Sequence, residues 1–157
     1  MRFATDATLG KLGRHLRAAG FDTLCQHENR NNDIFNALES DRIVVTRTKA
    51  LLTRLKHYPV IFIMDNDPFQ QVVQVFQELN IRQSDVNPFS RCLSCNLEIE
   101  TVDKQILGGK VPAYIWQHHQ TFRVCNGCKR IYWAGSHHCR LLKQFDMIFK
   151  CKGNTKQ

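Results

Sequence analysis

The sequence predicts a mixed α/β fold, a mainly parallel sheet with flanking helices, followed by a small metal-binding module. Strand-like apolar segments alternate with helix-like segments through residues 1–85, and this order is typical of βαβ units. Two Cys-x-x-Cys pairs then follow, Cys92 with Cys95 and Cys125 with Cys128. The first pattern predicts the sheet, and the second predicts the metal.

Four strands and four helices are expected in the first module. Leucines at positions 9, 12 and 16 share a helix face, and Gly20 is a natural residue to end that helix. Val60 to Met64 is a run of five apolar residues, as expected of a buried strand. Asp67-Pro68 then caps a helix that runs to about Leu79. The expected strands are residues 2–5, 21–26, 42–46 and 60–64; the expected helices are a first one from about Thr8, a short one capped by Asn32, then residues 47–56 and 68–79.

The domain boundary is expected in the polar stretch 82–90, which contains Asn87-Pro88. We therefore expect a first domain at 1–85, a cysteine module at 90–145 and a basic tail at 146–157. Gly108-Gly109 suggests a hairpin between strands at about 97–102 and 111–116.

The two Cys-x-x-Cys pairs predict a structural zinc site at Cys92, Cys95, Cys125 and Cys128. Each pair turns two sulfurs toward one point, so that two pairs give four thiolates in a tetrahedron. The chain has 7 cysteines, an odd number, which argues against a disulfide framework. The plain alternative is four unrelated buried or redox-active cysteines. A second metal at His137, His138 and Cys139 is the weaker interpretation of that cluster.

Composition and charge narrow the class of protein. An apolar fraction of 43% is enough for a packed core, and no apolar run reaches the roughly 18 residues of a membrane span. The N-terminus lacks the apolar core of a secretory signal, so we expect a cytoplasmic protein and no membrane partner. Residues 1–85 hold 11 Lys and Arg against 10 Asp and Glu, whereas residues 86–157 hold 11 against 4. The basic second half suggests a nucleic-acid partner, and a solvated basic surface is the alternative.

Acidic residues follow the predicted strands where a parallel sheet places its ligands. Asp6 follows the first strand, Asp33 opens the second helix, and Asp65 follows the strand at 60–64. Carboxylates near one point are what Mg²⁺ or Mn²⁺ needs for phosphodiester hydrolysis. Each acid also has a structural explanation, as a helix cap or a turn residue. The third strand ends at Thr46-Arg47-Thr48, without an acid.

These motifs together resemble the Mut-seven C-terminal RNase domain family, a PIN-like nuclease domain followed by a zinc ribbon. The resemblance runs over nearly the whole chain. It rests on the segments Asp6 to Asp22, Asn32-Asp33, Val44 to Arg47, Ser90 to Asn96, Val111-Pro112, Cys125 to Cys128 and Tyr132 to His137.

The resemblance implies a PIN-like fold and metal-dependent ribonuclease activity. It assigns Asp6 and Asp33 to an acidic site that holds Mg or Mn, with Lys11 and Arg14 beside it, and assigns the four cysteines to zinc. The chain departs from the family pattern at Thr48, where a Thr-Arg-Asp motif would place an acid. Either Asp65 or Asp22 compensates, or the chain binds RNA without cutting it efficiently.

The partner expected from these features is RNA, and no protein partner is indicated. Stacking and phosphate contacts are expected at Arg47, Arg123, Lys129, Arg130 and Trp133. Tyr132 and Trp133 also suit packing within the ribbon. Three hypotheses follow: a metal-dependent ribonuclease, an RNA-binding protein with a degenerate nuclease site, and a zinc-stabilised adaptor for other proteins.

Overall fold

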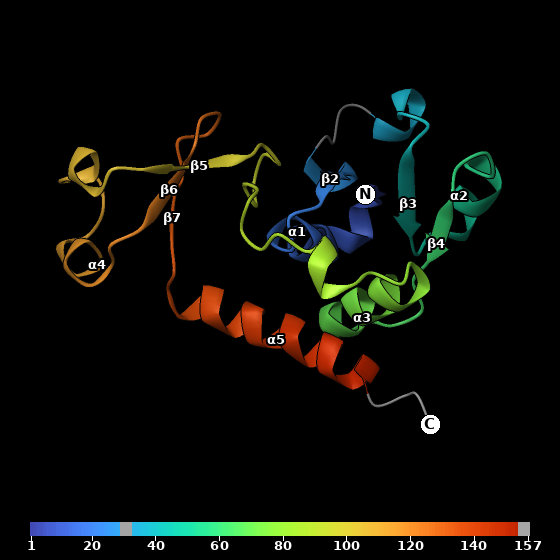
Figure 1. The fold of residues 1–157 in the computed structure, drawn as a ribbon. Coiled ribbons are helices and arrows are strands. Elements are labelled where there is room, and N and C mark those ends of the chain that lie inside the picture. The colour runs from blue at the N-terminus through green and yellow to red at the C-terminus, as the bar shows by residue number, and fades with distance from the viewer. Residues whose placement is uncertain (29–32, 154–157) are drawn as a thin grey trace.

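The computed structural model describes residues 1–28 and 33–153, and it contains two sheets of different kinds (Figure 1). The first has four parallel strands in the order β2-β1-β3-β4. The second has three antiparallel strands in the order β5-β6-β7. The predicted mixed fold, a mainly parallel sheet followed by a cysteine module, is confirmed.

The strands of the first sheet lie within two residues of the predicted ones. They are β1 (Arg2–Thr5), β2 (Asp22–Cys25), β3 (Arg42–Thr46) and β4 (Val60–Phe62). Three α-helices connect or follow them: α1 (Gly10–Ala18), α2 (Lys49–Arg54) and α3 (Pro68–Glu78). Short 3₁₀ turns are η1 (Ala7–Leu9), η2 (Gln26–Glu28), η3 (Ile34–Ala37) and η4 (Gln83–Asp85). The residue that caps η3 is Asp33, while the predicted cap Asn32 lies outside the described residues.

The ribbon differs from the predicted hairpin. Strand β5 (Ile99–Val102) pairs with β6 (Phe122–Cys125), and β6 pairs with β7 (Ile131–Trp133). The segment 111–116, predicted as a strand, instead leads into helix α4 (Ala113–His118), and η5 (Lys104–Leu107) precedes it. Pro112 explains this error, because proline has no N–H for a strand ladder and is well suited to the start of a helix.

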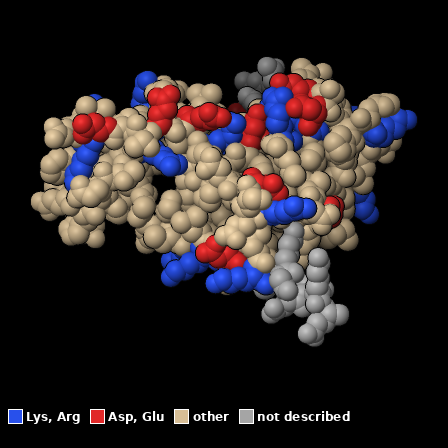
Figure 2. Space-filling model, viewed as in Figure 1, with Lys and Arg blue, Asp and Glu red and all other residues tan. Residues whose placement is uncertain are grey.

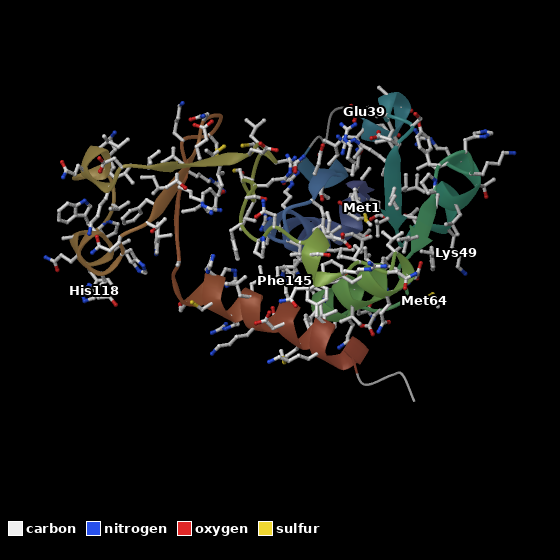
Figure 3. The ribbon with its side chains drawn as sticks, in the orientation of Figure 1. Met1, Glu39, Lys49, Met64, His118 and Phe145 are labelled. Atoms are coloured by element: carbon white, nitrogen blue, oxygen red, sulfur yellow. The ribbon has the colours of Figure 1, made fainter. Side chains whose placement is uncertain are left out.

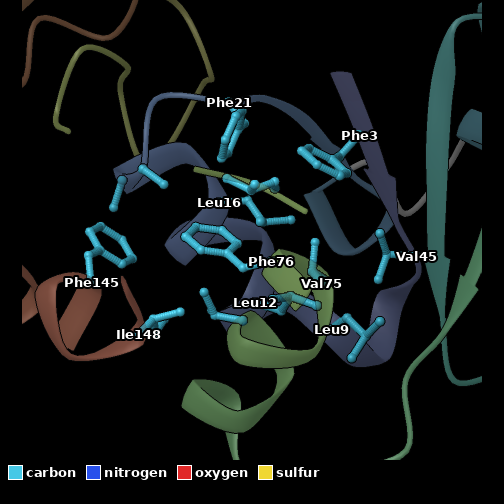
Figure 4. Close-up of a cluster of buried hydrophobic side chains, with 14 of the residues drawn as sticks. Phe3, Leu9, Leu12, Leu16, Phe21, Val45, Val75, Phe76, Phe145 and Ile148 are labelled. Carbon is cyan, nitrogen blue, oxygen red and sulfur yellow. The ribbon is translucent and has the colours of Figure 1, made fainter. Parts of the chain in front are cut away.

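The chain ends in a long helix that returns to the first sheet. Helix α5 (Ser136–Gly153) begins beside the ribbon and runs along α3 (Figure 1). Its Leu141, Phe145 and Ile148 are buried in the main core, and the Phe145 ring stacks on Phe76 of α3 at 6.1 Å (Figure 4). Residues 146–153, assigned to a basic tail from the sequence, therefore belong to this helix. One apolar core is built from both ends of the chain.

Charged side chains join the strands at the amino-terminal edge of the first sheet. Asp22 accepts hydrogen bonds from Arg42 at 3.0 and 3.1 Å and from Arg2 at 3.1 Å. The Arg42 side chain is 4% exposed, and its charge is balanced by Asp22 and by the more exposed Glu39 at 2.6 Å. Glu39, close to this edge, and Met64, beyond the other edge, are labelled in Figure 3.

Asp22→Asn is expected to destabilise the fold by about 2–4 kcal/mol at pH 7, because the buried Arg42 loses a charged partner. Asp41→Asn is the matched control, since Asp41 also pairs with Arg2 but is 57% exposed. Its loss is expected to cost less than about 0.5 kcal/mol. Urea unfolding curves of the three proteins measure both values, and equal stability of the two variants would contradict the role of Asp22.

The Asp22 carboxylate should also make the free energy of unfolding depend on pH. Burial opposes its ionisation, but hydrogen bonds from Arg42 and Asn96 and the charge of Arg42 lower the pKa of Asp22 from 3.8 to about 2. Stabilisation from a depressed pKa is present above the unfolded value and is lost as the pH falls through the folded one. The free energy of unfolding should therefore fall between about pH 4 and pH 2 by about 1–2 kcal/mol more in the wild type than in Asp22→Asn.

Candidate functional site

The four predicted zinc ligands come together in the ribbon. Over the part of the chain that the structure describes, Cys92, Cys95, Cys125 and Cys128 are the one group of three or more potential ligands with atoms within 4.8 Å of one another. Their sulfurs lie 3.5 Å apart for Cys92 and Cys128 and 3.2 Å apart for Cys95 and Cys125. Zinc–sulfur bonds of about 2.3 Å give a tetrahedron with edges near these distances. The donor set therefore fits zinc, and its four thiolates leave no open position.

Both cysteine pairs fold in the same way. The backbone N–H of Asn96 donates to the carbonyl of Cys92 at 3.0 Å, and that of Lys129 donates to Cys125 at 2.9 Å. Asn96 and Lys129 each follow the first cysteine of their pair by four residues, and both have a left-handed backbone, with φ of 66° and 59°. This repeated turn aims two sulfurs at one point from each side.

Tyr132 completes the zinc site. Its hydroxyl lies 3.0 Å from the Cys92 sulfur and accepts the backbone N–H of Leu93 at 3.2 Å. Burial opposes ionisation of Cys92, but the hydrogen bonds from Tyr132 and from the backbone of Cys95 and Ser94 lower the pKa of its thiol to about 6. Tyr132 thus supports a thiolate, and its hydroxyl is engaged inside the ribbon.

The first cysteine pair is fastened to the parallel sheet through Arg17. This guanidinium, with its side chain 2% exposed, donates to both oxygens of Glu28 at 2.9 and 2.8 Å and to the carbonyl of Thr23 at 2.9 Å. It also donates to the carbonyls of Leu93 and Ser94, between the two cysteines, at 3.1 and 2.9 Å. The zinc module and the first sheet therefore share one set of buried hydrogen bonds.

Asn96 adds a second link between the two modules. Its side-chain oxygen accepts the backbone N–H of Thr23 at 2.9 Å, and its nitrogen donates to Asp22 at 2.6 Å. Neither Arg17 nor Asn96 was expected from the sequence to join the modules. The Cys-x-x-Cys-Asn order is compatible with the turn, but it does not identify the strand that the amide meets.

Asp6 lies at the carboxyl end of β1, as predicted, and is buried at 3% exposure. One of its oxygens accepts the backbone N–H and the hydroxyl of Thr8 at 2.8 and 2.5 Å. The other accepts the Thr46 hydroxyl at 2.5 Å, the Arg47 N–H at 2.8 Å and the Thr48 hydroxyl at 3.2 Å. Five donors therefore surround one carboxylate, which also caps η1.

These hydrogen bonds keep Asp6 ionised. Burial opposes ionisation, but the hydrogen bonds from Thr46, Thr8 and Arg47 lower the pKa of Asp6 below its ordinary 3.8. Among the residues that the structure describes, no Lys, Arg or His forms an ion pair with it. The result is a buried negative charge stabilised by neutral donors.

The other predicted acids lie on either side of Asp6. Asp33 follows β2, caps η3 through the N–H of Phe35 at 3.0 Å, and pairs with Arg54 at 2.5 Å. Asp65 follows β4 and accepts the N–H of Asp67 at 2.7 Å in an exposed turn. In the strand order, β1 lies between β2, which Asp33 follows in the chain, and β3, and Asp65 follows β4 on the far side of β3.

Asp22 is excluded as a substitute for the missing acid. It begins β2 and lies opposite Arg2 in the register, at the amino-terminal edge of the sheet. Asp6 lies at the other edge. The sequence places Asp22 after the first helix, and only the register shows which end of the sheet it occupies.

The predicted basic residues divide between the modules. Lys11 and Arg14 are exposed on α1, and Arg47 is half-buried directly after β3. Lys129 and Arg130 are exposed in the turn between β6 and β7. Arg123 donates to the Phe89 carbonyl at 2.7 Å, and Trp133 packs against the small core of the ribbon.

The chain thus combines a parallel α/β domain with a module whose four cysteines could hold a metal ion. Residues 1–145 match the model of the Mut7-C RNAse domain, and the chain belongs to this family. No curated protein and no solved structure matches the chain. In the described residues, no helix combines the length and the hydropathy needed to cross a membrane.

Removing one zinc ligand should unfold the ribbon. Cys128→Ser is expected to lower the zinc content from one ion per chain to none and the melting temperature by more than about 10 °C, because zinc supplies much of the folding free energy of such a module. Cys139→Ser is the control, since Cys139 is equally an exposed free cysteine. Full zinc content in Cys128→Ser, measured by elemental analysis, would contradict the assignment.

Proposed function

We propose that the protein binds single-stranded RNA and is a member of its ribonuclease family with an incomplete metal-dependent centre, so that it cleaves RNA slowly. The observation that carries this proposal is the contact between Thr48 and Asp6. Where the family pattern has an acid, the chain has a hydroxyl that donates to the Asp6 carboxylate at 3.2 Å. The chain therefore lacks the second acid that the resemblance would place directly beside Asp6.

The donors present at this edge do not fit Mg²⁺ or Mn²⁺. A carboxylate has about four lone-pair positions, and Asp6 already accepts five hydrogen bonds. Magnesium sites use one or two carboxylates in near-octahedral geometry. The carboxylate of Asp33 is occupied by Arg54, and Asp65 follows a strand that does not neighbour β1. The contacts at this edge therefore give no support to a hydrolytic step through a metal ion.

A fully active metal-dependent ribonuclease is the second candidate. Its support is the charge of Asp6, because a buried carboxylate without a cationic partner attracts a cation. In this proposal Asp6 and Asp33, helped by Asp65, hold Mg or Mn after Thr8 and Thr48 rotate away. Lys11 and Arg14, exposed on α1, neutralise the scissile phosphate.

RNA binding is supported by charge. The second half of the chain carries 11 Lys and Arg against 4 Asp and Glu, and Lys129 and Arg130 are fully available to solvent in a turn. We propose that these two residues contact phosphates, as do Arg47 and Arg123. Trp133 supplies a ring on which a base can stack.

Thr48→Asp should restore cleavage if the missing acid is what limits it. The new carboxylate would lie beside Asp6 and give the edge two acids, so that Mn²⁺-dependent cleavage of a labelled single-stranded RNA is expected to rise at least tenfold. Asp6→Asn in the same background should abolish that gain. The rate of product formation on denaturing gels measures both.

Thr48→Asn is the matched control, because asparagine has the shape of aspartate without its charge. It is expected to cleave no faster than the wild type. The incomplete centre would be overturned if the wild type cleaves RNA rapidly, Asp6→Asn abolishes this cleavage and Thr48→Asp leaves it unchanged. That result would favour the second candidate. Equal cleavage by the wild type and by every variant, Asp6→Asn included, would indicate a contaminating nuclease and no activity of this edge.

Binding of RNA should weaken steeply with salt, because phosphate contacts release counterions. A Lys129→Gln, Arg130→Gln double variant is expected to reduce the slope of log K against log salt by about 1.4 for a single strand. A Lys56→Gln, Arg82→Gln double variant removes the same charge from exposed positions of the first module. Its slope should match that of the wild type in fluorescence anisotropy titrations, and an equal loss in both would contradict a site on the ribbon.

A further inference from the structure

A hollow of about 870 Å³ separates the ribbon from the start of α5. Its walls are the ribbon sheet, helix α4 at Tyr114 and Ile115, the linker at Pro88 to Leu93 and the first turn of α5. Figure 2 shows the surface hollowed between the ribbon lobe and the rest of the molecule. The volume lies within the range of small-molecule sites, which is roughly 300–1,000 Å³. It is a place distinct from the carboxyl edge of the first sheet.

Flat rings line much of this hollow. Trp133 and Tyr132 come from β7, and the ring of Phe89 lies 3.9 Å from that of His138. Gly135 lies against the indole of Trp133, where a Cβ would come within 3.1 Å of its Nε1. A side chain at position 135 would therefore crowd the edge of the Trp133 ring. Rings arranged in this way favour a planar ligand.

A few polar groups face the same space. The Arg123 guanidinium is fixed by its bond to the Phe89 carbonyl and has further N–H groups to donate. His138 also lines the hollow, and its ring packs against that of Phe89. An aromatic cavity with few polar groups is typical of a specific binding site.

The side chains that line the hollow favour a planar ligand that carries negative charge. No Asp or Glu lines it, whereas Arg123 and three histidines do. The half of the chain that forms it is basic. A planar group attached to an anionic backbone fits both the rings and the charge.

We propose that this hollow receives one unpaired nucleobase of a bound RNA strand, stacked on Trp133, with Arg123 beside the adjoining phosphate. The inference rests on the proposed RNA binding and adds where and how a base is held. It does not depend on cleavage.

The chain has only 2 tryptophans, which makes the test direct. Trp116 lies on α4, outside the hollow, so Trp116→Phe leaves Trp133 as the sole emitter. Titration of this variant with an eight-nucleotide oligoadenylate is expected to quench the emission of Trp133 to saturation. An abasic strand of the same length carries the same phosphates, and it should bind without quenching.

Equal quenching by the abasic strand would overturn base insertion. Binding of both strands with no quenching would also overturn it, while RNA binding itself would stand. Absence of binding by either strand would refute the proposed function and this inference together. Quenching by free AMP with an affinity within threefold of the oligonucleotide would show that the ligand is a free mononucleotide, against the RNA strand proposed.

A second measurement uses affinity. Trp133→Leu is expected to weaken binding of labelled oligoadenylate at least fivefold, in line with the loss of one stacked base. Trp133→Phe, which keeps a planar ring, should bind within about threefold of the wild type. Trp116→Leu is the matched control and should bind like the wild type. Zinc content confirms that each variant is folded, and equal effects of the two leucine variants would contradict a role specific to Trp133.

Discussion

The buried guanidinium of Arg17 holds together parts that the chain order separates. It extends from α1 to β2, to Glu28 and to the backbone between the first two zinc ligands. A buried charge of this kind is stable only while all its acceptors stay in place. The cysteine module is therefore not connected to the first sheet by a flexible linker alone. Its position relative to the first sheet is fixed from one side by Arg17 and from the other by α5, so the acidic edge and the aromatic hollow belong to one frame.

Much of the first sheet can be predicted from local sequence. Strands β3 and β4 contain short apolar runs, and helices α1 and α3 repeat apolar residues with helical spacing, so both patterns are visible in the sequence. The ribbon is different, because β5 finds its partner β6 beyond α4. Pairing across such a connection depends on register and not on local pattern. The segment 111–116 was predicted as a strand because Gly108-Gly109 suggested a hairpin turn, whereas Pro112 favours the helix that begins at Ala113.

The two candidate sites differ in the same way. Cysteine spacing alone brings four thiolates to one point, because each ligand pair lies within one tight turn. The surroundings of Asp6 depend on Thr8, which follows β1, and on Thr46 to Thr48 at the end of β3, and the pairing of these two strands brings them together. Sequence places an acid at a strand end, but it does not show how many donors already surround that acid. The hollow is assembled from the linker, the ribbon strands, α4 and the start of α5, and its only sequence signals were Trp133 and Arg123.

Helix α5 also sets a condition on biosynthesis. Phe76 on α3 is covered by Phe145 and Phe149, which the ribosome adds about seventy residues later. At roughly 5–20 residues per second, the nascent N-terminal half waits for about 3–14 s with this aromatic face uncovered. The zinc ribbon emerges during that interval. The cysteine cluster is thus assembled before the main core closes, and a nascent chain stalled before residue 141 would leave this aromatic face exposed to chaperones.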